Sequence, residues 1–188
     1  MVMLKEHRHV ADDHEIASSY TAERIREVYT PRKKFRRNKK AGENETAERF
    51  LGKINETYDT NYALSEKPLP ENSPVDCVAV DAKTSRSLLL QVRTSDDEPI
   101  KDLMQGKIVH RSGKRHEIHH GTIKRAILSK STKYPAAVKK GLTLLLDGWL
   151  GVTEEDLEEF VAGEQTMLRG TGFKEIWFVG SDLIKRLV

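Results

Sequence analysis

The sequence predicts an α/β fold in which helices flank a mixed sheet, with a helical appendage at the N-terminus. The first observation is a pair of apolar runs, 74–81 and 87–94, separated by a short polar segment of five residues that begins with Ala82, which is typical of a β-hairpin. The second is a pair of later apolar runs, 141–147 and 173–179, which have the length of buried strands. The third is that segments with apolar residues at helical spacing lie before and between these runs.

Length and composition indicate one domain with an appendage. The 188 residues, of which 37% are apolar, can form a single core. We divide the chain into residues 1–41, an N-terminal helix with a basic arm, and residues 42–188, the α/β domain. No apolar run reaches the length of a membrane span, and the N-terminus lacks the apolar region of a signal peptide. The single cysteine, Cys77, is interpreted as a core residue. We expect a cytoplasmic protein with no membrane association.

Positive charge is concentrated in two segments, although the net charge of the chain is only +3. Residues 1–41 carry 11 lysines and arginines against 6 acidic residues, and residues 101–140 carry 11 against 2. The remaining residues have a net charge of −11. This pattern is typical of a surface that binds a polyanion such as nucleic acid, although solvated surface charge also produces it.

Residues 12–29 have a broken apolar stripe that predicts one helix or two short ones, ending before Pro31. The next segment, 32–40, has seven basic side chains in nine residues, which are too dense to pack together. We expect an extended arm that contacts nucleic-acid phosphates, links the appendage to the domain, or does both. Its basic residues are Arg32, Lys33, Lys34, Arg36, Arg37, Lys39 and Lys40.

Residues 43–58 are the clearest predicted helix, because apolar side chains recur on one face at helical spacing. They are Ala47, Phe50, Leu51, Ile54 and Tyr58. At about 100° per residue, Glu43 lies on this apolar face and Glu48 lies on its flank. Both are also ordinary acids for the start of a helix, where the macrodipole favours negative charge.

Three polar residues interrupt the apolar hairpin at one end. If Ala82 pairs with Ser87, Asp76 lies opposite Arg93, and Gln91 shares their face. Buried polar groups cost free energy unless they are satisfied. One explanation is an ion pair between Asp76 and Arg93 with Gln91 beside it. The other is a divalent-metal site, since carboxylate and amide oxygens are hard ligands suited to Mg²⁺.

The order of these residues resembles the signature of the PD-(D/E)XK nuclease superfamily, which has the restriction-endonuclease-like fold. That signature has an acidic residue after a proline, then a hairpin, then (E/D/Q)-x-K. Here it is Pro74-Val75-Asp76 followed by Gln91-Val92-Arg93. Some branches, including restriction enzymes that attack modified DNA, are similar in carrying glutamine as the first residue of the second motif. Arg93 departs from the lysine that orients and activates the attacking water in this superfamily.

The resemblance implies an αβββαβ core over residues 42–147 and a Mg²⁺ or Mn²⁺ cofactor. It implies that Asp76 binds the metal and that Gln91 orients the water or adds its amide oxygen. Arg93 would stabilise charge near the scissile phosphate. A glutamate of the first helix often reaches the metal in this superfamily, and the helical position favours Glu43, with Glu48 as the second choice.

A short strand is expected at 61–67, and a helical piece near 100–109. Residues 109–121 are interpreted as a basic loop facing nucleic acid, because their closely spaced histidines lack the cysteine partner or HExxH pattern of a zinc site. Residues 122–133 predict a helix. The basic residues of this region that would contact nucleic acid are Arg111, Lys114, Arg115, Lys124 and Arg125.

Within the helix at 122–133 we expect Ile123, Ile127 and Leu128 to face inward and Lys130 to face outward. Farther along, Thr153 with Asp156 forms a capping pattern for a helix that runs to 163 or 169. Ser181, after the last strand, is expected to begin a short C-terminal helix.

The leading hypothesis is a metal-dependent nuclease that hydrolyses nucleic-acid phosphodiesters, like a DNA endonuclease. Its partner would be nucleic acid, DNA in preference to RNA, and a homodimer is compatible with the sequence. The first alternative is a catalytically inactive nuclease fold that binds nucleic acid or serves as an assembly subunit, because Gln91 and Arg93 depart from the acid-and-lysine pair. The second is a protein-interaction domain whose basic segments face acidic partners.

Overall fold

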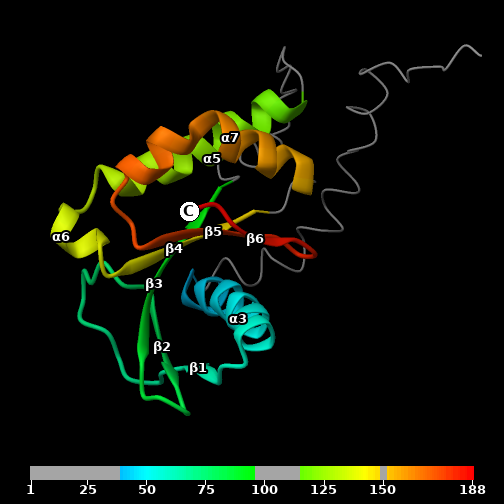
Figure 1. The fold of residues 1–188 in the computed structure, drawn as a ribbon. Helices are drawn as coiled ribbons and strands as arrows, with labels where there is room; N and C mark the ends of the chain where they lie inside the picture. The colour runs from blue at the N-terminus through cyan, green and yellow to red at the C-terminus, as the bar shows by residue number, and fades with distance from the viewer. Residues whose placement is uncertain (1–38, 96–114, 149–151) are drawn as a thin grey trace, which may run out of the picture.

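A six-stranded mixed sheet forms the centre of the domain (Figure 1). The computed structural model of the chain describes residues 39–95, 115–148 and 152–188. In the described residues the strands lie side by side in chain order, with β3, β4 and β5 parallel and the other neighbours antiparallel. They are β1 (Tyr62–Leu64), β2 (Cys77–Asp81), β3 (Ser87–Thr94), β4 (Leu142–Asp147), β5 (Glu175–Val179) and β6 (Ile184–Arg186). The predicted α/β class with a mixed sheet is confirmed.

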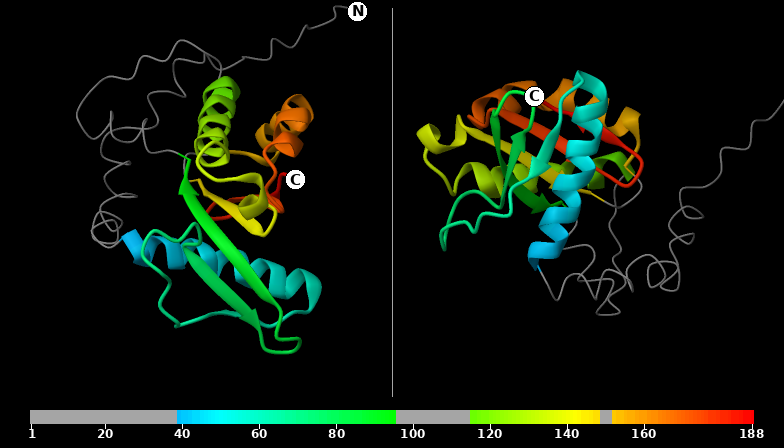
Figure 2. Two further views of the ribbon diagram at one scale, coloured as in Figure 1. Left: turned by 90° about the vertical axis from the view of Figure 1, so that its left-hand side faces the viewer. Right: turned by 90° about the horizontal axis from the view of Figure 1, so that it is seen from below.

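Helices cover both faces of the sheet, as Figures 1 and 2 show. Helix α3 (Lys39–Tyr58) packs on one face, and helices α5 (Arg115–Ser131) and α7 (Glu154–Gly170) pack together on the other. The short helix α6 (Ala136–Lys139) connects α5 to β4. Within the described ranges, no helix has the length and apolar character needed to span a membrane.

The core therefore has two parts, one on each face of the sheet. On the α3 side, Phe50 meets Trp177 edge to face with ring centroids 5.2 Å apart. On the α5 and α7 side, Ile127 and Phe160 are fully buried against Leu144 of β4. Alternate residues of β4 point into the two parts, since Leu145 belongs to the first and Leu144 to the second.

Helix α3 begins earlier than predicted, at Lys39. Lys39 and Lys40 therefore lie in its first turn and not in an extended arm. Lysine is a good helix former, and Lys39 forms an ion pair with Glu43 one turn later at 3.2 Å. The predicted apolar face is confirmed as far as Ile54, but Tyr58 is 58% exposed at the last residue of the helix. The appendage at 12–29 and the arm at 32–37 lie outside the described residues.

The hairpin of β2 and β3 forms as predicted, but its register is shifted by two residues. Cys77 pairs with Leu90, which places Asp76 opposite Gln91 and not opposite Arg93. A shift of two preserves the faces of a strand, so these three polar residues still belong to the same side of the sheet. The predicted ion pair between Asp76 and Arg93 is wrong, because the Asp76 carboxylate bonds to residues 91 and 92 instead.

Helix α5 also begins earlier than predicted, so residues 115–121 are helical and not a loop. Its inward face continues one turn farther than expected, from Ile123 and Ile127 to Lys130, which lies seven residues after Ile123. The predicted inward position of Leu128 is wrong, since its side chain is 38% exposed. The segment 96–114 lies outside the described residues, and with it the helical piece expected near 100–109.

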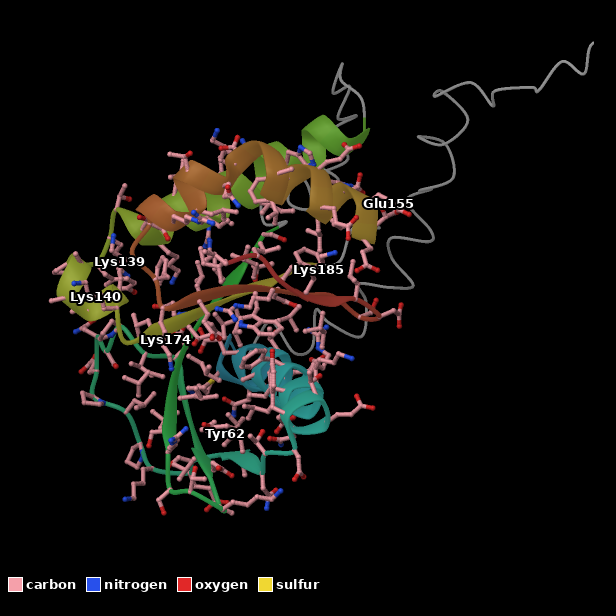
Figure 3. The ribbon with its side chains drawn as sticks, in the orientation of Figure 1. Tyr62, Lys139, Lys140, Glu155, Lys174 and Lys185 are labelled. Atoms are coloured by element: carbon pink, nitrogen blue, oxygen red, sulfur yellow. The ribbon has the colours of Figure 1, made fainter. Side chains whose placement is uncertain are left out.

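The C-terminal elements agree with the sequence except for the last one. The capping box of α7 is confirmed, with Thr153 and Asp156 each accepting a hydrogen bond from the backbone N–H of the other. The helix expected from Ser181 is instead the strand β6, paired with β5. Lys185 of β6 lies beneath α7 and forms ion pairs with Glu154 at 2.9 Å and Glu158 at 2.7 Å (Figure 3). The sequence did not predict β6 because its three residues are too few to show the alternation typical of a strand.

Arg49 connects α3 to the carboxyl ends of β4 and β5 through hydrogen bonds. Its guanidinium donates to Asp147 Oδ1 at 2.9 Å and to the carbonyl oxygen of Gly180 at 2.6 Å. The side chains of this ion pair are only 21% and 17% exposed. Removal of one partner leaves a poorly solvated charge on the other, which costs more than the loss of a surface ion pair.

We predict that Arg49→Met lowers the free energy of unfolding by about 2 kcal/mol, less than for a fully buried pair. Lys53→Met is the matched control, because Lys53 is exposed on the same helix. Urea denaturation followed by circular dichroism measures both variants. Equal midpoints for the two variants would contradict this role for Arg49.

Candidate functional site

A cleft of about 680 Å³ opens beside the start of β2. It lies between the first turn of α3, the connection from β1 to β2, and the end of α5. Three acidic residues line it, Glu43, Glu66 and Asp76, together with five lysines. The lysines are Lys39, Lys40, Lys67, Lys130 and Lys133. We call this space the carboxylate cleft.

Asp76 is held at the base of the hairpin by its own backbone and side chain. Its N–H donates to the carbonyl oxygen of Leu90 at 2.8 Å, which extends the hairpin pairing by one residue. Its Oδ2 accepts hydrogen bonds from the Val92 N–H at 2.8 Å and from Gln91 Nε2. The other oxygen, Oδ1, accepts no hydrogen bond from the described residues and can serve a ligand in the carboxylate cleft.

Gln91 lies directly behind Asp76 and is only 1% exposed. Its amide nitrogen donates to Asp76, but its Oε1 finds no hydrogen-bond donor among the described residues. A buried amide oxygen without a donor is rare and costs about 1–3 kcal/mol. The structure therefore brings together Asp76 and Gln91, as the sequence predicted, and leaves one buried oxygen that a water or a cation would satisfy.

Glu43 is a further carboxylate of the cleft, and its side chain is 12% exposed. Burial raises the pKa of the Glu43 carboxyl, and the neighbouring Asp76 carboxylate raises this pKa further. The ion pair with Lys39 opposes this shift without cancelling it. Glu48, the second choice from the sequence, is exposed and does not line the carboxylate cleft.

Lys40 connects the first turn of α3 to the start of β2. Its Nζ donates to the carbonyl oxygen of Asp76 and lies 3.9 Å from Cys77 Sγ. Burial raises the pKa of the Cys77 thiol to about 11, so the thiol stays protonated near neutral pH. The interpretation of Cys77 as a core residue is supported by its exposure of 3%.

Lys130, Lys133 and Tyr134 are site residues that sequence reasoning missed. Lys130 lines the carboxylate cleft from the end of α5, and Lys133 and Tyr134 line it from the turn that follows, where Lys133 Nζ lies 5.3 Å from the centre of the Tyr134 ring. Burial lowers the pKa of Lys130, and the nearby Asp76 carboxylate partly reverses this. The signal in the sequence was the spacing of Lys130, one heptad after Ile123 on the buried face.

The remaining predicted site residues are not brought to the carboxylate cleft. Arg93 and Arg125 line a second hollow, beside the end of β3. Lys124 forms an ion pair with Glu164 of α7 at 2.6 Å. Arg115 begins α5, and its side chain is not described. The other predicted nucleic-acid contacts, Arg32, Lys33, Lys34, Arg36, Arg37, Arg111 and Lys114, lie outside the described residues.

The described histidines of the basic segment take part in helix packing. His119 Nδ1 lies 3.2 Å from Asp156 Oδ2, and His120 Nε2 lies 2.8 Å from the carbonyl oxygen of Asp156. The His120 ring also meets Phe160 edge to face, with centroids 5.5 Å apart. These contacts join α5 to α7 on the face of the sheet opposite α3.

The residues of the carboxylate cleft fit a divalent cation that uses few protein ligands. Among the described residues, no three histidine, cysteine, aspartate or glutamate side chains are grouped closely enough to hold a metal. Mg²⁺ usually binds one or two carboxylates and completes its shell with waters and substrate phosphates. Asp76 and Glu43 supply two carboxylates, and the Gln91 amide oxygen lacks a donor beside them.

Comparisons with models of protein families, with curated proteins and with solved structures found no match to this chain.

We predict that Glu43→Gln raises the melting temperature at pH 7. The folded-state pKa of Glu43 lies above its unfolded value, so the wild type loses stability as the pH rises from the unfolded pKa through the folded pKa. Glutamine does not ionise and avoids this loss. The difference in melting temperature between the variant and the wild type should narrow on acidification. It should vanish below about pH 4, where Glu43 is protonated in both the folded and the unfolded state. Differential scanning calorimetry between pH 3.5 and 8 measures it.

The control is Glu48→Gln, which removes an exposed glutamate from the same helix. This variant should follow the wild type at every pH. A Glu43→Gln protein that is less stable than wild type at pH 7 would mean that the ion pair with Lys39 outweighs burial and the repulsion from Asp76.

Proposed function

We propose that the protein is a divalent-metal-dependent nuclease that hydrolyses phosphodiester bonds of nucleic acid, DNA in preference to RNA. The observation that carries the proposal is the carboxylate cleft, where three carboxylates, those of Asp76 and Glu43 among them, lie among five lysines. Carboxylates suit a hard cation, and lysines suit the phosphates on either side of a scissile bond. A purely structural ion-pair network would not need an open space of about 680 Å³ at its centre.

The order and position of the motif residues support the same proposal. Asp76 at the start of one hairpin strand and Gln91 on the next are hydrogen-bonded to each other, and a glutamate of the preceding helix faces the same cleft. This arrangement resembles the PD-(D/E)XK superfamily in the order of its elements and in the element that supplies each acid. We propose the restriction-endonuclease-like core on this ground.

In the proposed reaction, a water oxygen forms a bond to phosphorus while the bond from phosphorus to the leaving oxygen breaks. A bound Mg²⁺ or Mn²⁺ would lower the pKa of that water and neutralise charge on the phosphate. Asp76 and Glu43 would hold the cation. The hydrogen bonds from Val92 N and Gln91 Nε2 both go to Oδ2 of Asp76, which would leave Oδ1 for the cation.

In this proposal Lys130 takes the role of the lysine that ends the second motif in the superfamily, because this chain has Arg93 at that position. It reaches the carboxylate cleft from α5, close enough to Asp76 for their charges to interact. Its lowered pKa makes its ammonium a better proton donor, and its neutral amine a more available acceptor, than those of an exposed lysine. Lys130 would orient the attacking water and stabilise the charge that develops on the phosphate.

The second candidate is a nuclease fold that binds nucleic acid without cutting it. The observation that favours it is the hydrogen bond from Gln91 to Asp76, which satisfies one carboxylate oxygen from within the protein. In this case the lysines around the cleft would contact phosphates, and the carboxylates would not bind a cation.

We predict that full-length protein nicks supercoiled plasmid in Mg²⁺ or Mn²⁺ and that Asp76→Asn abolishes this activity. Asparagine keeps an oxygen for the Val92 N–H but lacks the charge that holds a cation. Lys130→Met should lower the rate by about 100-fold, the lower range for proton-transfer or charge-stabilising groups. Nucleic-acid affinity should stay within a few-fold of wild type in both variants.

Lys140→Met is the control for lost lysine charge, because Lys140 is exposed at the residue that follows α6 (Figure 3) and does not line the cleft. Single-stranded DNA, duplex DNA and RNA of one sequence are compared as substrates. Binding without cleavage in the wild type would favour the inactive fold. Cleavage that survives in Asp76→Asn would remove the carboxylate cleft from the mechanism.

A further inference from the structure

Tyr134 lines the carboxylate cleft but takes no part in the proposed hydrolysis. Among the described residues that line the cleft, it is the only aromatic side chain. It lies in the segment between α5 and α6 and is partly exposed. Lys130 lies four residues earlier, and its Nζ is 6.0 Å from the centre of the Tyr134 ring. An aromatic ring is therefore next to a lysine that would contact the phosphate.

The carboxylate cleft is larger than a phosphate and a cation require. Its volume of about 680 Å³ is within the range of roughly 300–1,000 Å³ for pockets that bury a drug-sized ligand. A nucleotide is a ligand of that size. The carboxylates and lysines suit its phosphate, and the remaining space suits its base, which has a π-face that stacks on aromatic side chains.

The connection from β1 to β2 lies below the start of α6 in Figure 1 and forms another wall of the cleft. Residues 68–70 of this wall have the sequence Pro-Leu-Pro, which gives the cleft apolar side chains besides the ring of Tyr134. Proline fixes its own φ and restricts the residue before it, so this stretch has little backbone freedom. The Ser65 N–H, at the start of the connection, donates to the carbonyl oxygen of Val78 at 2.8 Å. The wall is thus in place before a ligand arrives.

Two lysines lie over the Tyr134 ring, Lys130 with its Nζ at 6.0 Å from the ring centre and Lys133 at 5.3 Å. Lys133 is exposed, and a cation–π contact at an exposed site is weaker than the stacking of a base on an aromatic ring. A base can therefore take a face of the ring, and the displaced ammonium group can contact a phosphate. Basic and aromatic side chains side by side are typical of sites that bind single-stranded nucleic acid.

We propose that a base of the substrate stacks on Tyr134, so that the carboxylate cleft takes an unpaired nucleotide of a single strand. This inference rests on the proposed nuclease function and adds the class of substrate to it. A base inside a duplex is covered by its neighbours and must leave the stack before a side chain can cover it, which costs free energy. An unpaired base avoids most of this cost. Tyr134 would thus select single strands, while Asp76 and Lys130 act at the phosphate.

The test compares labelled DNA oligonucleotides of one length: a single strand, its duplex, and an abasic strand that keeps the phosphates and lacks the bases. Fluorescence anisotropy measures their binding to the full chain in EDTA, so that metal-dependent cleavage plays no part. The wild type should bind the single strand about tenfold more tightly than the abasic strand, as expected for one stacked base. Tyr134→Leu should lower the affinity for the single strand about tenfold and leave the affinities for the abasic strand and the duplex within about twofold.

Two control variants make the result specific. Tyr134→Phe keeps the ring and should bind the single strand like wild type, which separates stacking from the loss of the hydroxyl. Tyr58→Leu removes a tyrosine that is 58% exposed at the end of α3 and does not line the cleft, so it should bind all three oligonucleotides like wild type. Circular dichroism checks the fold of each variant, and Tyr134→Ser replaces Tyr134→Leu if the latter does not fold.

The outcomes separate this inference from the nuclease proposal. Equal affinity of the wild type for the single strand and the abasic strand, or an equal loss for all three oligonucleotides in Tyr134→Leu, would overturn stacking and leave the nuclease proposal standing. A loss confined to the single strand, in a protein that cleaves nothing in Mg²⁺, would support stacking and remove the nuclease activity. Displacement of the strand by thymidine monophosphate at the same nucleotide concentration as by unlabelled strand would identify a free nucleotide as the ligand and overturn the single-strand assignment. No binding of DNA by the wild type would overturn both proposals.

Discussion

The candidate site depends on the position of the Asp76 carboxylate. One oxygen of this carboxylate accepts two hydrogen bonds, one from the Val92 N–H and one from the Gln91 amide. They fix the end of the hairpin one residue before β2 begins, and they orient the carboxylate. Residue 76 must keep an oxygen acceptor there, because the Val92 N–H would otherwise lose its partner. These two hydrogen bonds thus stabilise both the pairing of the strands and the position of the Asp76 carboxylate in the cleft.

The cleft exists because helices from opposite faces of the sheet meet beside this point. Helix α3 brings Glu43 from one face, and helix α5 brings Lys130 from the other. Opposite charges then lie close together around an open space, where Glu43 forms an ion pair with Lys39 of its own helix. Burial raises the pKa of Glu43 and lowers the pKa of Lys130, so both groups are less stable in their charged forms than on an open surface. Such pairs of shifted groups are typical of functional sites, although structural networks also contain them.

Periodicity was enough to predict the class of fold, the hairpin and most of the buried faces of α3 and α5, with Tyr58, Leu128 and Lys130 as the exceptions. It could not predict the hairpin register, because the turn has five residues and both registers bury the same faces. That difference of two residues decided whether Asp76 met Arg93 or Gln91. The charge of Lys130 predicts an outward position for its side chain, whereas its spacing from Ile123 indicates the buried face. The meeting of α5 with α3 at one cleft is a tertiary feature that local patterns do not contain.

The central claim is that Asp76 and Glu43 bind a divalent cation, and paramagnetic broadening by Mn²⁺ tests it most directly. Substoichiometric Mn²⁺ is added to ¹⁵N-labelled full-length protein, and the loss of each amide signal is measured. We expect selective broadening around Asn44, Cys77 and Val92, restored by excess Mg²⁺ and absent in Asp76→Asn. Broadening that is uniform, centred elsewhere or unchanged in Asp76→Asn would contradict the account.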